Sequence, residues 1–397
     1  MNNFRVWWQA PKLHQETEGH ERKVSWLELF YDLVFVVIIA RLAHYLGYHL
    51  EASGVLEYLF LFLPVFWVWV GGTIYNDRFE THDVSYRFFV FLQILAASSM
   101  AVFIEGGLDK SADAFAWSYV AARLIIIAMW WRGGRHNPIA RPLTNRFVAG
   151  FSIGAGLWVL SIFVEGPLSL ALKLLGLAVD LITPATTLRI QKNLPRLSTA
   201  KITERFGLFA IIVLGEGLLG VINGFTDAKT INAAAALRFG LGMLLIFGLW
   251  WIYFDYIARR PPAAVLARRM TWSYAHFFLL AGITALAAVL VHMVGLKGGS
   301  LEDTARWILL GSYAAVLAAM ALLIWTLEAE KTVVIEDTLS IPVMLGAAVL
   351  ALGLGFLKPS VSLLLGALVL INLGFMLFGA VRWFSSPASR GSHADEL

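Results

Sequence analysis

The chain of 397 residues contains no cysteine, and only 15% of its residues are charged. The absence of cysteine excludes disulfide bonds, thiolate metal sites and a cysteine nucleophile, but it does not identify a compartment. The low charge excludes an ordinary soluble fold, in which about 25% of residues are charged. Hydrophobic residues make up 59% of the chain, and the mean hydropathy is +0.72. These values predict an all-α polytopic membrane protein.

Common catalytic signatures are also missing from the sequence. It has no Walker-type phosphate loop, no G-x-S-x-G, no H-E-x-x-H and no dinucleotide fingerprint. Lys173 falls near the end of an apolar run, so no lysine is placed for a retinal Schiff base. The net charge of +4 is only weak support for a nucleic-acid partner. We therefore expect a protein without enzyme activity, cofactor or nucleic-acid partner.

Apolar runs long enough to cross a bilayer organise nearly the whole chain. A spanning helix needs roughly 17–25 residues. The first run is too long for the core of a cleaved signal peptide and is expected to remain as an anchor. Twelve runs can be read, at about 26–49, 55–76, 86–105, 112–131, 146–165, 168–188, 204–224, 235–257, 272–294, 304–327, 338–356 and 361–383.

Basic residues predict the orientation of these runs. Most of the 31 lysines and arginines fall in the N-terminal segment and in every second loop. By the positive-inside rule, both termini are expected in the cytoplasm, with the chain in an inner (plasma) membrane. The basic loop ARRPPAAVLARR (258–269) is expected to contact anionic lipid headgroups of that bilayer.

A weak internal repeat predicts two halves. Glu28-Leu29-Phe30 is echoed by Glu204-Arg205-Phe206 at the start of the seventh run, and Tyr75-Asn76-Asp77 is echoed by Tyr253-Phe254-Asp255. Six helices return the chain to its starting side, so the halves would be parallel repeats, as in some secondary transporters. The predicted parts are a cytoplasmic segment (1–25), two six-helix halves (26–201 and 202–384) and a disordered tail (385–397).

Three stretches carry a resemblance to a known family. They are WLELFYDLVFVVIIARLAHYL (26–46), NDRFETHD (76–83) and ITERFGLFAIIVLGE (202–216). Together they resemble the bacterial low-temperature-requirement protein A family, over nearly the whole chain. The resemblance implies an integral membrane protein and supplies no substrate, so a mechanism has to come from the residues themselves.

Two carboxylates lie at the start of the first run. Glu28 and Asp32 are about 40° apart around a helix, and each costs roughly 2.5–3.5 kcal/mol to insert. Ser25 and Glu28 fit a capping box, and Glu204 is assigned the same structural role in the repeat. Asp32 lies too far from Ser25 for capping. It is expected to meet an arginine or water and is a functional candidate.

Three further charges fall near the middle of predicted helices, namely Arg123, Asp180 and Glu216. A fixed ion pair between Arg123 and one acid is the structural alternative, but the second acid would then need a proton or a cation. Pro184 removes a backbone donor after Asp180, and the Thr183 hydroxyl adds an oxygen nearby. We therefore predict an ion or solute pathway formed by Asp32, Arg123, Asp180, Thr183 and Glu216.

The loop NDRFETHD supplies a second hypothesis. Asp77, Glu80 and Asp83 are hard oxygen ligands that could hold Mg²⁺ and a diphosphate, as in membrane-embedded enzymes acting on lipid or prenyl diphosphates. Such enzymes need a second acidic loop, and the repeat offers only Asp255. Local ion pairing is the structural alternative for this loop.

The reading favoured by these residues is a secondary transporter of an ion or small solute, with protons as a candidate coupling ion. A membrane-embedded enzyme using the loop 76–83 and a non-catalytic membrane scaffold remain as alternatives.

Overall fold

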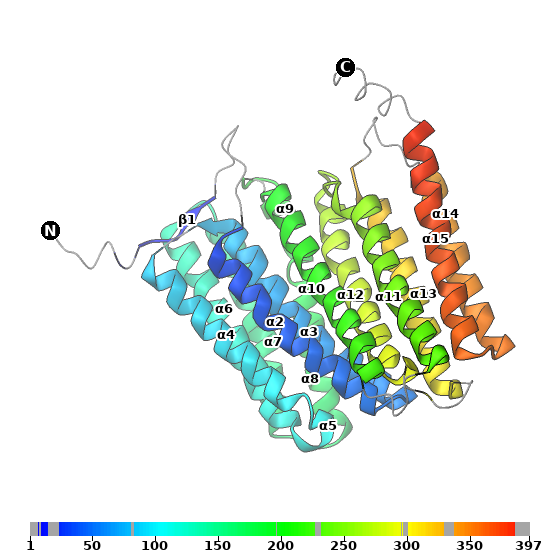
Figure 1. The fold of residues 1–397 in the computed structure, drawn as a ribbon. Helices are drawn as coiled ribbons and strands as arrows, with labels where there is room; N and C mark the ends of the chain where they lie inside the picture. The colour runs from blue at the N-terminus through cyan, green and yellow to red at the C-terminus, as the bar shows by residue number, and fades with distance from the viewer. Residues whose placement is uncertain are drawn as a thin grey trace. The chain divides into compact units, whose positions relative to one another are not determined.

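The computed structural model describes residues 7, 9–14, 24–80, 83–195, 197–226, 232–294, 296, 301–328 and 337–385 (Figure 1). It confirms the all-α class, and each predicted run coincides with a long helix. These helices are α2 (Trp26–Tyr48), α3 (Ala52–Arg78), α4 (Val84–Phe103), α6 (Ala112–His136), α7 (Arg141–Ile162), α8 (Pro167–Ile182), α10 (Thr199–Thr226), α11 (Ala233–Tyr253), α12 (Leu266–Val294), α13 (Asp303–Thr326), α14 (Asp337–Leu354) and α15 (Val361–Ser385).

Short elements complete the described chain. They are β1 (Lys12–Leu13), β2 (Phe79–Glu80), α5 (Gly107–Lys110), the 3₁₀ turns η1 (Ala185–Thr187) and η3 (Gly355–Leu357), α9 (Leu188–Gln191) and the π-helical turn η2 (Phe254–Ala258). Within the described residues, eleven helices are long and apolar enough to cross a membrane. The helix α2, which carries Glu28, Asp32 and Arg41, is not among these eleven.

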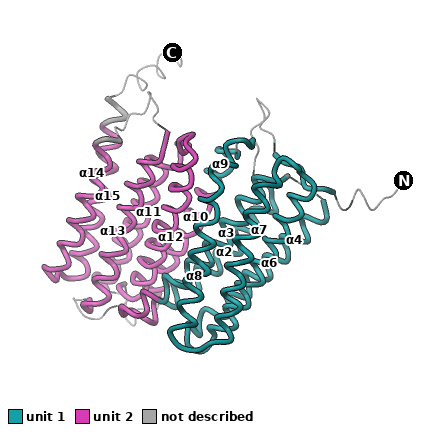
Figure 2. Tube along the Cα trace, turned by 180° about the vertical axis from the view of Figure 1, so that it is seen from behind, with its two compact units in different colours: residues 1–45, 57–205 teal, residues 46–56, 206–397 magenta. Residues whose placement is uncertain are grey.

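The chain forms two compact units (Figure 2). Unit 1 contains Met1–Tyr45 and Glu57–Arg205, and unit 2 contains Leu46–Leu56 and Phe206–Leu397. The helix α10 therefore contributes its first turns to unit 1 and the rest of its length to unit 2. The parallel internal repeat stays a prediction.

Unit 1 is held together by close helix packing. The helix α6 packs along α4 and α7, and α7 packs along α8. Glycines permit the α7–α8 contact, since a Cβ added to Gly154 would lie 2.6 Å from Asp180 Oδ1 and 3.0 Å from the Gly176 carbonyl oxygen. Any larger residue at Gly154 would push the two helices apart.

Unit 2 packs α13 along α12 and α14, and α11 along α15. A buried polar link supports the second of these contacts: Asn372 Nδ2 donates to the Leu245 carbonyl at 3.1 Å and its Oδ1 accepts from the Tyr313 hydroxyl at 2.7 Å. Gly248 leaves room for Asn372, because a Cβ there would lie 2.6 Å from Nδ2. The link satisfies polar atoms that hydrocarbon cannot solvate.

An N-terminal strap, residues 9–14, crosses the ends of three helices in unit 1. Its strand β1 pairs antiparallel with β2, with Leu13 opposite Phe79. Asn137, at the end of α6, donates to the Pro11 carbonyl at 2.7 Å and accepts from the Leu13 amide at 3.3 Å. Part of the predicted N-terminal segment is thus integral to the fold. The predicted tail beyond residue 385 lies outside the described residues.

Candidate functional site

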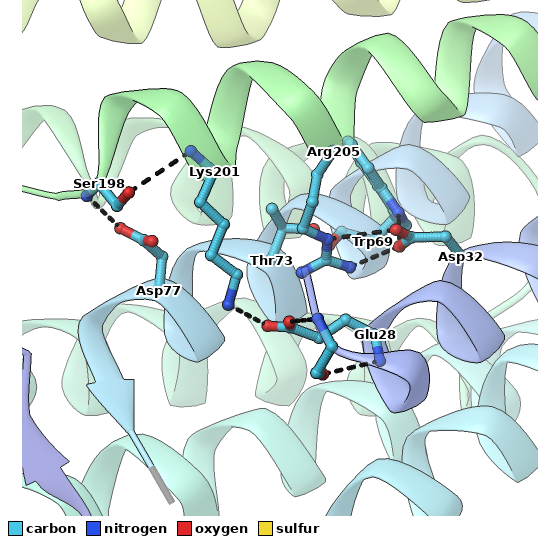
Figure 3. Close-up of polar contacts among 9 residues, drawn as sticks. Glu28, Asp32, Trp69, Thr73, Asp77, Ser198, Lys201 and Arg205 are labelled. Carbon is cyan, nitrogen blue, oxygen red and sulfur yellow. Dashed lines mark hydrogen bonds and ion pairs between the residues drawn. The ribbon is translucent and has the colours of Figure 1, made fainter. Parts of the chain in front are cut away.

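Two acids on α2 face two bases on α10, which we call the acid–base ladder: Glu28 with Lys201, and Asp32 with Arg205 (Figure 3). Lys201 Nζ bonds Glu28 Oε1. Arg205 Nε donates to Asp32 Oδ2 at 3.2 Å, while Nη2 donates to Oδ1. All four side chains are 1% exposed. The ladder therefore presents paired, neutralised charge rather than a free carboxylate.

Matched spacing explains how the sequence builds the ladder. The acids are four residues apart on α2 and the bases four residues apart on α10, so each pair occupies one helix face. The arginine expected for Asp32 is Arg205, and the Trp69 indole donates a further bond to Asp32 Oδ1 at 2.8 Å. Sequence reasoning placed Arg205 at the start of the seventh apolar run and did not single out Lys201. Their spacing, identical to that of the acids, is the signal that it missed.

Glu28 serves both the ladder and the start of its own helix. Its Oε2 accepts from the Ser25 amide at 2.9 Å, and its amide donates to Ser25 Oγ at 3.3 Å. These reciprocal bonds are those of a capping box. Glu204 has a different environment from its supposed counterpart, because its side chain on α10 is exposed.

The stretch 76–83, predicted as a loop, begins inside α3, which ends at Arg78, and its described acids Asp77 and Asp83 hold helix ends. Asp77 Oδ2 accepts from the Ser198 amide at 2.9 Å, just before α10 begins, and Arg78 Nη1 donates to the Pro195 carbonyl at 2.5 Å. Both contacts fix the segment that leads into α10. Glu80 lies in β2 but its side chain is outside the described residues, as is His82.

Asp83 caps α4. Its Oδ1 accepts from the Tyr86 amide at 3.2 Å, and its Oδ2 accepts from the Ser85 hydroxyl at 2.6 Å and from the Gln9 amide at 2.7 Å. Burial of this carboxyl favours the neutral form, but these hydrogen bonds outweigh it and lower the pKa of Asp83. Across the described part of the chain, no group of three His, Asp or Glu residues is placed to hold a metal ion.

Arg123, Asp180 and Tyr119 form a second buried charge cluster in unit 1, which we call the Arg123 centre. Arg123 Nε lies 3.0 Å from Asp180 Oδ2, and the Tyr119 hydroxyl donates to the same oxygen. The Arg123 Cζ lies 4.2 Å from the centroid of the Phe151 ring, a cation–π contact. Arg123 and Asp180 are both 0% exposed. Sequence reasoning identified the two charges and missed Tyr119.

Thr183 does not join this cluster through its hydroxyl. Thr183 Oγ1 donates to the Val179 carbonyl at 2.6 Å, one turn back on α8. The helix α8 ends at Ile182, and the 3₁₀ turn η1 follows after Pro184. This interruption agrees with the break predicted from Pro184. The Thr183 hydroxyl hydrogen is thus used to satisfy a carbonyl at the helix end, and its predicted place in the ion pathway stays a prediction.

Glu216 belongs to unit 2, whereas the other predicted pathway residues belong to unit 1. It lies in the second half of α10 and is half-buried. Gly215 before it has open space at its Cβ position, and Gly217 after it packs against Ile246. No hydrogen bond or ion pair joins the Glu216 carboxylate to any residue that the structure describes.

These features define a polytopic α-helical membrane protein in which buried ion pairs join α2 to α10 and α6 to α8. Among the described residues, the Glu216 carboxylate on α10 has no hydrogen-bond or ion-pair partner. The sequence pattern described as "Bacterial low temperature requirement A protein (LtrA)" matches residues 23–383, and the chain belongs to this family. The resemblance drawn from the three sequence stretches is thereby confirmed.

A relative in Rhizobium meliloti (strain 1021), named "Uncharacterized protein RA0937", is 26% identical over 246 residues. The matched part covers 59% of this chain and 59% of the relative. No solved structure matches the chain.

Proposed function

We propose that this membrane protein is a secondary transporter of an ion or small solute, with protons as the coupling ion. The observation that carries the proposal is Glu216, a half-buried carboxylate within a membrane-spanning helix and without a protein partner among the described residues. An ionised carboxylate in hydrocarbon costs roughly 2.5–3.5 kcal/mol. A proton, a cation or water has to compensate this cost, and binding and release of a proton is the step that coupling requires.

The paired charges support the assignment to Glu216 by exclusion. Each acid of the ladder is neutralised by a base, so neither Glu28 nor Asp32 is available without breaking a buried pair. Asp180 is paired with Arg123. Among the acids predicted for the pathway, only Glu216 has no hydrogen-bond or ion-pair partner among the described residues, and a Cβ added to the neighbouring Gly215 would meet nothing within 4 Å.

The two described acids of the stretch 76–83 do not favour the enzyme alternative. Asp77 and Asp83 accept hydrogen bonds from backbone groups at the starts of α10 and α4, which are structural tasks. The scaffold alternative is the outcome that remains if no flux is found.

Proteoliposomes containing a pH-sensitive dye test the proposal. Proton flux is measured under an imposed pH gradient with sodium, potassium, ammonium and acetate in turn. Glu216→Gln keeps the shape and hydrogen-bonding capacity but cannot titrate, so it is expected to abolish flux that the wild type shows. Glu204→Gln is the matched control on the same helix, where the side chain is exposed, and should retain full flux. Equal flux in wild type and Glu216→Gln, or none in the wild type, would refute the proposal.

A further inference from the structure

Arg123 has donors that the protein leaves unused. Nη1 and Nη2 of Arg123 find no hydrogen-bond partner within the described part of unit 1, although this residue is 0% exposed. An acceptor, Oε1 of Gln93 on α4, is likewise without a partner there and is 1% exposed. About 90% or more of buried polar groups in native proteins have a partner. The terminal edge of this guanidinium is therefore a place where a bound molecule supplies acceptors.

The geometry of the guanidinium limits what that molecule can be. Its Nε side is taken by Asp180, and one face lies over the Phe151 ring. The open part is the edge formed by Nη1 and Nη2, whose parallel N–H groups match the two oxygens of a carboxylate. On the α3 side this edge meets Gly71, which has no side chain to cover it.

We propose that Arg123 binds the carboxylate of a small organic anion through Nη1 and Nη2. The inference rests on the proposed transport function and names its substrate class. A carboxylate added to the neutral Arg123–Asp180 pair leaves one negative charge in a buried site. A proton taken up by Asp180 restores neutrality at this site, so anion and proton bind together. Asp180 would then titrate only when an anion occupies Arg123, as a second titrating group beside Glu216, whose proton is not needed for anion binding.

The groups facing Asp180 are compatible with this coupling. Tyr119 donates to Asp180 Oδ2, and Tyr31 on α2 interacts electrostatically with Arg123. The remaining neighbours of the Arg123–Asp180 pair are Gly71 on α3, Gln93 on α4, and Phe151 and Gly154 on α7. None of these side chains titrates. Asp180 Oδ1 forms no hydrogen bond among the described residues and packs against Gly154.

Gly71 offers a variant that blocks the edge without disturbing the charges. A Cβ there would lie 3.5 Å from Arg123 Nη1 and 3.9 Å from Ile126 Cγ1, which are ordinary contacts. Gly71→Ala should therefore fold, while its methyl group occupies the space beside Nη1. Gly156→Ala on α7 is the matched control, since nothing lies within 4 Å of its Cβ position.

The test measures acetate binding to the purified full chain in nanodiscs by calorimetry, with sodium acetate, sodium chloride and choline chloride as probes. We expect acetate to bind and chloride not to. Affinity should fall about tenfold per unit rise in pH where free Asp180 is ionised, because one proton accompanies each anion. Gly71→Ala and Arg123→Lys should lose binding at least about tenfold, while Gly156→Ala and Glu216→Gln retain it.

Asp180→Asn supplies the second readout, because it mimics the protonated acid. It should bind acetate without the pH dependence. An absence of acetate binding in both wild type and Asp180→Asn, equal binding of chloride, or unchanged binding in Gly71→Ala would overturn the proposal. Acetate binding by a protein that shows no flux in proteoliposomes would instead refute the transport function and leave the binding site standing.

Discussion

Arg205 contacts both carboxylate oxygens of Asp32, with its Nε 3.2 Å from Oδ2 and its Nη2 bonded to Oδ1. Bidentate pairs of this kind are the strongest side-chain hydrogen bonds and fix orientation as well as distance. Asp32 was predicted to be part of an ion pathway. In the structure its carboxylate joins α2 to the start of α10, and its role in a pathway stays a prediction.

Removing Asp32 should destabilise the protein strongly. Asp32→Ala leaves the buried Arg205 charge without its partner, at an expected cost of about 3–5 kcal/mol. Denaturant unfolding in detergent micelles measures the change. Glu204→Ala, on the same helix but exposed, should stay within about 0.5 kcal/mol of wild type. A loss below about 1 kcal/mol for Asp32→Ala would show that the ladder contributes little to stability.

Packing of α7 on α8 predicts opposite effects for two glycines on one helix. Gly154→Ala should destabilise by about 1–3 kcal/mol, because its methyl group would overlap Asp180 and the Gly176 carbonyl. Gly156→Ala meets nothing within 4 Å and should be neutral or stabilising by up to about 1 kcal/mol, since alanine favours helix. Thermal unfolding of the two variants side by side checks the prediction. Similar midpoints for both would contradict the close α7–α8 contact.

The capping carboxylate of α4 predicts a pH effect. The pKa of Asp83 is lower in the folded protein, so its ionised form adds stability above the unfolded pKa of about 3.9. That stability is lost as the pH falls through the folded value. Asparagine caps helices as well as aspartate, but its amide nitrogen cannot accept the bonds that Asp83 Oδ2 accepts from Ser85 and Gln9. Asp83→Asn therefore removes the charge together with these two bonds, and the pH dependence of the difference reports the charge.

We expect wild type to unfold at a higher temperature than Asp83→Asn at neutral pH, with the two converging below about pH 4. Thermal scans across this range provide the measurement. Asp109→Asn, in an exposed position on α5, is the control and should match wild type throughout. A constant gap between Asp83→Asn and wild type down to pH below about 3 would mean that the carboxylate charge is not responsible.

The distribution of basic residues predicts the membrane topology. Reporter fusions after residues 52, 110, 228 and 299 should be active in the periplasm, and fusions after residues 138, 195 and 264 in the cytoplasm. Paired alkaline phosphatase and fluorescent-protein fusions at each site measure the side. Two or more reversed sites would contradict the cytoplasmic placement of both termini.

The helices could be predicted from sequence because apolar runs of spanning length leave little choice of structure. In a bilayer, backbone polar groups have to be satisfied within the segment. Even the interruption after Asp180 followed from Pro184, which α8 reflects by ending at Ile182. These features depend on residues close together in the chain, so they can be predicted from a single sequence.

Contacts between residues far apart in the chain could not be predicted from the sequence. Lys201 and Arg205 sit close to a loop in sequence, and only the packing of α10 in unit 1 shows that they neutralise Glu28 and Asp32. The N-terminal strap is a similar case, because residues 9–14 carry no periodic pattern and are ordered by β2 and Asn137. Pairing of distant residues depends on tertiary contacts that a single sequence does not state.

The helix α10 runs without a break from Thr199 to Thr226, yet it belongs to unit 1 through Arg205 and to unit 2 beyond it. An α-helix rises about 1.5 Å per residue, so Glu216 lies about 16 Å along the axis from Arg205. The acid–base ladder holds the first turns of α10 in place, and the Glu216 carboxylate lies further along the same helix. A single continuous helix thus carries a first stretch whose charges are neutralised in buried ion pairs and, further along, a carboxylate without a partner among the described residues.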